Sequence, residues 1–120
     1  MQLNRFADIP SFLELVRTRP GMWIGKASIR SLWHMFHGIW FAEDLYGIPD
    51  DARWGGFDFD AFEAWVDKTY NVQRLSACSF PLAAMIAGSD DHGFSLWFEW
   101  YDRFRAEQRA GPPTRGEDAV

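Results

Sequence analysis

The chain has 120 residues, a hydrophobic fraction of 48% and an aromatic fraction of 18%. This length suits one domain, and so much apolar surface excludes an intrinsically disordered chain. The net charge of −5 argues against general nucleic-acid binding, because that affinity comes from lysine and arginine that neutralise phosphates. No apolar run approaches the roughly 20 residues that cross a bilayer, and a single cysteine, Cys78, suits a reducing compartment. We therefore expect a cytoplasmic protein with neither membrane nor nucleic-acid partners.

Residues 10–18 predict the first helix. Pro10 fits its first turn, where a missing N–H costs nothing, and the helix must end before Pro20. Residues 19–25 contain proline and two glycines, but also apolar residues that favour burial: Met22, Trp23 and Ile24. We predict an ordered Pro-Gly loop that packs inward.

The longest predicted helix begins after Ser28, a favourable N-cap, and ends near Tyr46, where Gly47 is a natural C′ residue. Its apolar residues follow helical spacing and form one face: Ile29, Leu32, Trp33, Phe36, Ile39 and Trp40. Glu43 falls inside this apolar arc. We predict a structural ion pair of Glu43 with Arg19 or Arg17, which would fix the Pro-Gly loop to the helix.

Three further helices are predicted. Residues 60–70 begin with the capping-box spacing of Asp60 and Glu63, and residues 82–87 form a short helix. The last helix runs from about Asp91 to Ala110, and its aromatic residues cover more than half of its circumference. Since no strand-like alternation occurs, the sequence predicts an all-α fold. We expect one domain of four or five helices over residues 1–110 and a flexible tail at 111–120.

The run from Val16 to Gly25, followed by Leu32-Trp33-His34-Met35, resembles the start of the ATPase domain of DNA gyrase and related topoisomerases. In that family the following helix carries a catalytic glutamate and a magnesium-binding asparagine. Alignment on the Leu-x-His-Met match places Gly38 at the glutamate position and Ala42 at the asparagine position. Because both functional side chains are absent, we predict no ATP hydrolysis and no enzymatic activity.

Residues 5–105 are similar in layout to a group of small bacterial proteins that resemble immunity proteins encoded beside secreted polymorphic toxins. The shared features are an Arg-x-Arg-Pro-x-Met-aromatic-aliphatic-Gly loop, a helix like residues 32–46, a Phe-x-x-Trp-Val segment at 62–66 and a final acidic-aromatic helix at 90–104. The resemblance implies a protein that binds and neutralises a cognate toxin.

Acidic residues are concentrated between positions 41 and 67, where eight acids face one arginine, a net charge of −7. Trp54 lies among them, and an aromatic surrounded by like charge is typical of an anchor for a basic partner. We predict a partner-binding surface made of these residues: Asp44, Asp50, Asp51, Trp54, Asp58, Asp60, Glu63 and Asp67. The alternative is a solvated face on which Asp58 and Asp60 only cap a helix.

The sequence leaves two other functions open. His34 and His37 stand one turn apart, but a metal site needs three or four ligands, so we predict no metal and no cofactor. Glu43 and the histidines could still line the pocket of a small enzyme or ligand-binding domain. The wide apolar face of the last helix suggests instead a self-associating module, with a monomer or weak homodimer as the expected state.

Overall fold

The computed structural model describes residues 8–70 and 78–110. Its α-helices, in chain order, are α1 (Ile9–Thr18), α2 (Pro20–Trp23), α3 (Ile29–Leu45), α4 (Phe59–Tyr70), α5 (Ser79–Ala87) and α6 (Asp90–Ala110). A short 3₁₀ helix, η1 (Asp50–Ala52), lies between α3 and α4. All regular structure in the described residues is helical, so the all-α prediction is confirmed. The predicted tail at 111–120 lies outside them.

The predicted Pro-Gly loop begins with a helical turn instead, which is why the described ranges contain six α-helices. Pro20 occupies the first position of α2, where its fixed φ favours a helix. The backbone N–H of Ile24 then donates to the carbonyl oxygen of Pro20 at 2.8 Å. This turn leaves Met22 65% exposed, so only part of the segment packs inward.

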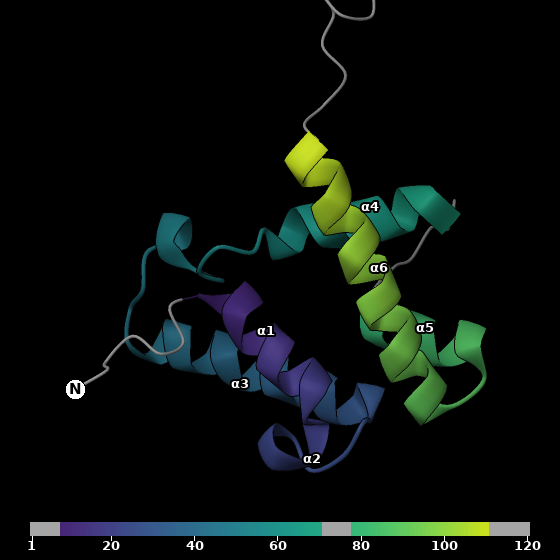
Figure 1. Cartoon of the computed structure of the whole chain (residues 1–120). Helices are drawn as coiled ribbons and strands as arrows, with labels where there is room; N and C mark the ends of the chain where they lie inside the picture. Colours follow the sequence, from purple (N-terminus) through teal and green to yellow (C-terminus); the bar gives the residue numbers. More distant parts are fainter. Residues whose placement is uncertain (1–7, 71–77, 111–120) are drawn as a thin grey trace, which may run out of the picture.

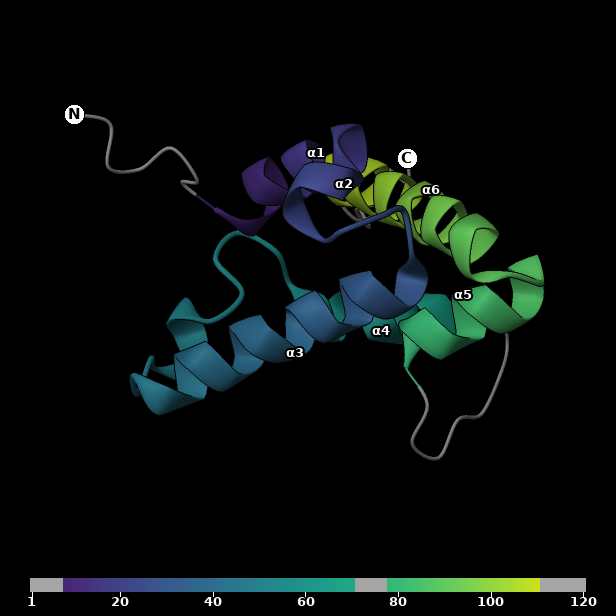
Figure 2. The same cartoon turned by 90° about the horizontal axis from the view of Figure 1, so that it is seen from below.

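The helices form two layers (Figures 1 and 2). The first layer contains α1, α2 and α6, and the second contains α3, α4 and α5. Helix α6 contacts α5, α3 and α4, so it joins the layers along most of its length. The C-terminal part of α3 extends past the beginning of α1 in both views. That end of α3 therefore has less covering from the opposite layer.

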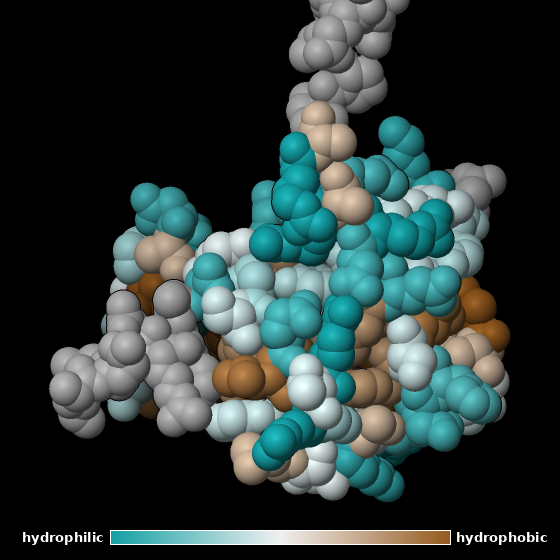
Figure 3. Space-filling model, in the orientation of Figure 1, coloured by the Kyte–Doolittle hydropathy of each residue, from teal (hydrophilic) through white to brown (hydrophobic). Residues whose placement is uncertain are grey.

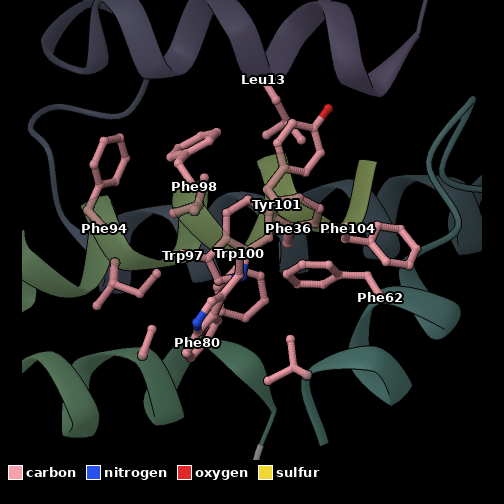
Figure 4. Packing of buried hydrophobic residues seen from close by; sticks show 14 of the residues in the cluster. Leu13, Phe36, Phe62, Phe80, Phe94, Trp97, Phe98, Trp100, Tyr101 and Phe104 are labelled. Atoms are coloured by element: carbon pink, nitrogen blue, oxygen red, sulfur yellow. The ribbon is translucent and has the colours of Figure 1, made fainter. Parts of the chain in front are cut away.

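The core between the layers is built from aromatic rings (Figure 4). Trp97 and Trp100 of α6 are fully buried, and α3, α4 and α5 each supply a buried phenylalanine: Phe36, Phe62 and Phe80. The rings of Trp97 and Phe80 stack with their centroids 5.4 Å apart. Neighbours from both layers thus cover the wide apolar face of α6. This face no longer supports the hypothesis of self-association through the last helix.

Hydrogen bonds at their N-terminal ends join α3 and α6. Ser28 caps α3, as predicted, by accepting a hydrogen bond from the backbone N–H of Ser31 at 3.1 Å. Asp90 at the start of α6 accepts one from the backbone N–H of Arg30 at 3.1 Å. The hydroxyl of Ser28 is the main cause that lowers the pKa of Asp90 below its ordinary value of 3.8. The starts of α3 and α6 are therefore tied together.

The outer face of the first layer is polar toward the end of α6. Figure 3 shows hydrophilic residues covering the C-terminal half of this helix. Among the residues that the structure describes, no helix is both long and apolar enough to cross a membrane.

Candidate functional site

A hollow of about 440 Å³ lies where η1 meets the start of α4. Its lining includes four of the predicted binding acids and two residues between them: Asp50, Asp51, Asp58, Asp60, Arg53 and Trp54. Four carboxylates and one guanidinium leave a net charge of −3 on this lining. We call this hollow, whose lining also includes Phe59, the acidic hollow. The structure thus brings the central part of the predicted surface together.

The other predicted acids lie outside the hollow. Asp44, at the end of α3, has its Oδ1 atom 3.6 Å from Nη2 of Arg53. Glu63 and Asp67 lie on α4, are half-buried and do not line the hollow. Charge concentration along the sequence could not separate these residues from the others, because it ignores the direction in which each helix points its side chains.

Glu63 has a structural position in place of the predicted surface role. Its carboxylate accepts hydrogen bonds from the backbone N–H and the hydroxyl of Ser79, at 2.8 and 2.6 Å. The indole N–H of Trp97 in turn donates to Oγ of Ser79 at 2.9 Å. Glu63 therefore connects α4 with α5 and with the core. The predicted capping role also changes: Asp58, not Asp60, accepts the hydrogen bond from the N–H of Ala61, at 3.0 Å.

The predicted ion pair of Glu43 with Arg17 or Arg19 is replaced by other contacts. The guanidinium of Arg17 donates to the carboxylate of Asp102 on α6 at 2.6 and 3.1 Å. It also lies 4.7 Å from the ring centroid of Phe98. Arg19 is exposed, and no ion pair involves it within residues 8–70 and 78–110. The last turns of α1 face α6 within the same layer, whereas Glu43 belongs to the opposite layer.

Glu43 instead holds the backbone of Trp54. Its Oε2 atom accepts a hydrogen bond from the N–H of Trp54 at 2.9 Å. Trp54 has a φ of 59°, in the left-handed region, which is rare for a bulky side chain and costs on the order of 1 kcal/mol. Its indole stacks on Phe59, with ring centroids 4.9 Å apart, and is half-buried. Trp54 is therefore one wall of the site and not the free surface anchor that the sequence suggested.

The carboxylate of Glu43 leads to a stability prediction. Its second oxygen, Oε1, is buried without a hydrogen-bond partner in the described part of the chain. Glu43→Gln keeps an acceptor for the N–H of Trp54, so we expect the free energy of unfolding to change by less than about 0.5 kcal/mol. Glu43→Ala leaves that N–H unpaired and should lower the free energy of unfolding by about 1–2 kcal/mol. Urea denaturation measures both; a loss of about 3 kcal/mol in Glu43→Gln would indicate an ion pair instead.

The pocket expected for an enzyme does not form in the way the sequence suggested. Glu43 lines a separate, mainly apolar hollow of about 470 Å³ between α1, α3 and η1. His37 and His34 line two other hollows, so the structure does not bring the histidines to Glu43. Across the described ranges, no group of three or more His, Cys, Asp or Glu side chains could hold a metal ion.

An apolar groove of about 400 Å³ lies beside the acidic hollow, and sequence reasoning did not predict it. We call it the aromatic groove; its lining consists of Trp33, Phe36, His37, Trp40, Trp54, Phe59, Cys78 and Phe80. The helical spacing of apolar residues in α3 predicts Trp40 on the core face, but its side chain is 50% exposed. One feature of the sequence could have indicated the groove: too many large apolar residues lie at and just after the end of α3 for one face to bury them. These residues are Trp40, Phe41, Leu45 and Tyr46.

The acidic hollow and the aromatic groove adjoin each other. Trp54 and Phe59 line both of them, so their stacked rings form a shared wall. This pair of surfaces is the candidate functional site. Comparison with known proteins found no relative of this chain: no family model, no curated protein and no solved structure matches it.

Proposed function

We propose that this chain is a non-catalytic, immunity-type protein that binds and neutralises a basic bacterial toxin, and that the acidic hollow is its binding surface. One observation carries the proposal: four carboxylates gather around a tryptophan held in a left-handed conformation. Residues kept in such rarely populated conformations cluster at functional sites, because the surrounding structure must compensate for the strain. Here the compensation comes from Glu43 and from the ring of Phe59.

Negative charge around an aromatic wall suits a basic protein partner. Toxins that attack nucleic acids carry lysine and arginine side chains that neutralise phosphates. Carboxylates at the hollow compete for the same cations, and their combined field raises the rate of encounter. Neutralisation by occlusion requires no chemical step. Gly38 and Ala42 agree with this, since both are exposed on α3 and neither carries a catalytic group.

The test reverses two charges whose side chains form no hydrogen bond or ion pair in the described ranges. Asp51 and Asp60 are exposed and form no hydrogen bond or ion pair in the described ranges, whereas Asp58 caps α4 and Asp50 faces Arg53. We expect Asp51→Lys/Asp60→Lys to raise the Kd for the proposed basic toxin by about tenfold or more. Rescue of cells from that toxin should be lost as well. Calorimetry and a growth assay measure the two effects.

A matched variant separates the local effect from that of total charge. Glu14→Lys/Glu99→Lys changes the net charge by the same amount on exposed positions of α1 and α6, away from the hollow. Glu14 lies 3.9 Å from Arg17, whose shorter ion pair with Asp102 at 2.6 Å remains in this variant. This control should keep both affinity and rescue. If both double variants behave like the unmodified chain, or lose binding equally, the acidic hollow is not the binding surface.

A further inference from the structure

We propose that the aromatic groove and the acidic hollow together bind one amphipathic basic segment of the partner. A bulky apolar side chain of that segment enters the groove, and its neighbouring lysine or arginine side chains lie over the hollow. This inference rests on the proposed function and specifies the chemistry of the contact segment.

The shared wall makes one segment the natural ligand for both surfaces. Trp54 and Phe59 line the groove and the hollow, with their ring centroids 4.9 Å apart. A chain that crosses these rings therefore meets an apolar surface on one side and carboxylates on the other. Separate ligands would compete for the same two side chains.

The groove has the size and lining of a binding site for a side chain. Its volume of about 400 Å³ falls in the range of roughly 300–1,000 Å³ that is typical of ligand pockets. Trp33, His37 and Trp40 follow one face of α3 and form its edge. Trp40 remains 50% exposed although its ring borders the groove. Exposed apolar patches with a polar rim mark interaction sites.

Charge around the groove favours a basic partner over a second copy of this chain. Asp44 lies one turn beyond Trp40 on α3, and the acidic hollow lies across the shared wall. A symmetric dimer places the same patch of each subunit against the other. Two copies would then bring carboxylates together, which is unfavourable, whereas lysine and arginine in the partner would be attracted.

The experiment uses the full chain and three synthetic helical peptides of about four turns. The first peptide carries leucines on one face and lysines on the other. The second replaces the leucines with serine and keeps the charge, and the third replaces the lysines with glutamate. Calorimetry gives each Kd. The indole N–H resonances of Trp40 and Trp54 in ¹⁵N spectra show where each peptide binds.

We expect the Leu/Lys peptide to bind, with shifts of both indole resonances, and the other two to bind at least about tenfold more weakly. Trp40→Ala should weaken the Leu/Lys peptide by about tenfold or more. Phe41→Ala is the matched control: Phe41 is the next residue of α3 and is 62% exposed, but it does not line the groove. This variant should bind as the unmodified chain does.

Other results would overturn the inference in distinguishable ways. Equal binding of the Leu/Lys and Ser/Lys peptides, with no effect of Trp40→Ala, would show that the groove is not part of the binding site. The acidic hollow would then remain the proposed binding surface. Loss in Trp40→Ala but none in Asp51→Lys/Asp60→Lys would overturn the proposed function and this inference with it. A dimer in sedimentation that Trp40→Ala dissociates would assign the groove to a second copy. Failure of all three peptides to bind would also refute the inference.

Discussion

Trp97→Ala is expected to lower the free energy of unfolding by about 4 kcal/mol. The side chain is fully buried, and its ring packs against Phe80, Phe62 and Tyr101, with centroids 5.4, 5.1 and 5.8 Å away. The substitution also removes the hydrogen bond from the indole N–H to Ser79. Because a domain of this size has a total stability of about 5–15 kcal/mol, the loss should be evident in urea denaturation.

The same substitution at another tryptophan is the control for this prediction. Trp40 lies at the exposed end of α3 and contributes less buried area. We expect Trp40→Ala to lower the free energy of unfolding by less than about 1 kcal/mol. This value also supports the binding experiment, since a loss of peptide affinity in Trp40→Ala would then not come from unfolding. Equal destabilisation by the two variants would contradict the two-layer packing.

Gly93→Ala is expected to lower the free energy of unfolding by up to about 2 kcal/mol, although alanine favours helices over glycine. A Cβ at Gly93 would lie 3.0 Å from Cα of Ala84 and 3.2 Å from Cγ2 of Ile29. The first of these atoms belongs to the backbone of α5, so α5 and α6 must separate to admit the methyl group. Such overpacking costs about 1–3 kcal/mol, more than the roughly 1 kcal/mol gained in helix propensity.

Gly38→Ala provides the opposite result for the same change. Gly38 lies inside α3, is exposed, and a Cβ there would meet no atom within 4 Å. Helix propensity alone should then raise the free energy of unfolding by about 0.5–1 kcal/mol. Thermal and urea denaturation of the two variants measure the sign of each change in the free energy of unfolding. Stabilisation by Gly93→Ala would show that α5 and α6 do not approach each other closely at this point.

The acidic hollow shows why a cluster in sequence is only partly a cluster in space. Asp50 and Asp51 lie in η1, Asp58 directly precedes α4, and Asp60 lies in its first turn, so all four come from one short stretch of the chain. Such local proximity was visible in the sequence. Glu63 and Asp67 belong to the body of α4, where helical geometry turns successive side chains in different directions. Their separation from the hollow followed from the orientation of α4.

Local chemistry by itself determined the helical class of the fold, the N-cap at Ser28 and the strong negative charge of the segment before α4. These features depend on residues within a few positions of each other, so spacing and composition are sufficient to predict them. Only the tertiary structure decided which surface stays open. Trp40 follows the apolar spacing of α3, yet its side chain is 50% exposed because it lines the open aromatic groove and does not enter the core. The tertiary structure also decided that Arg17 pairs with Asp102 and that Glu43 accepts a hydrogen bond from Trp54. The packing of the two layers determines which residues distant in sequence come into contact.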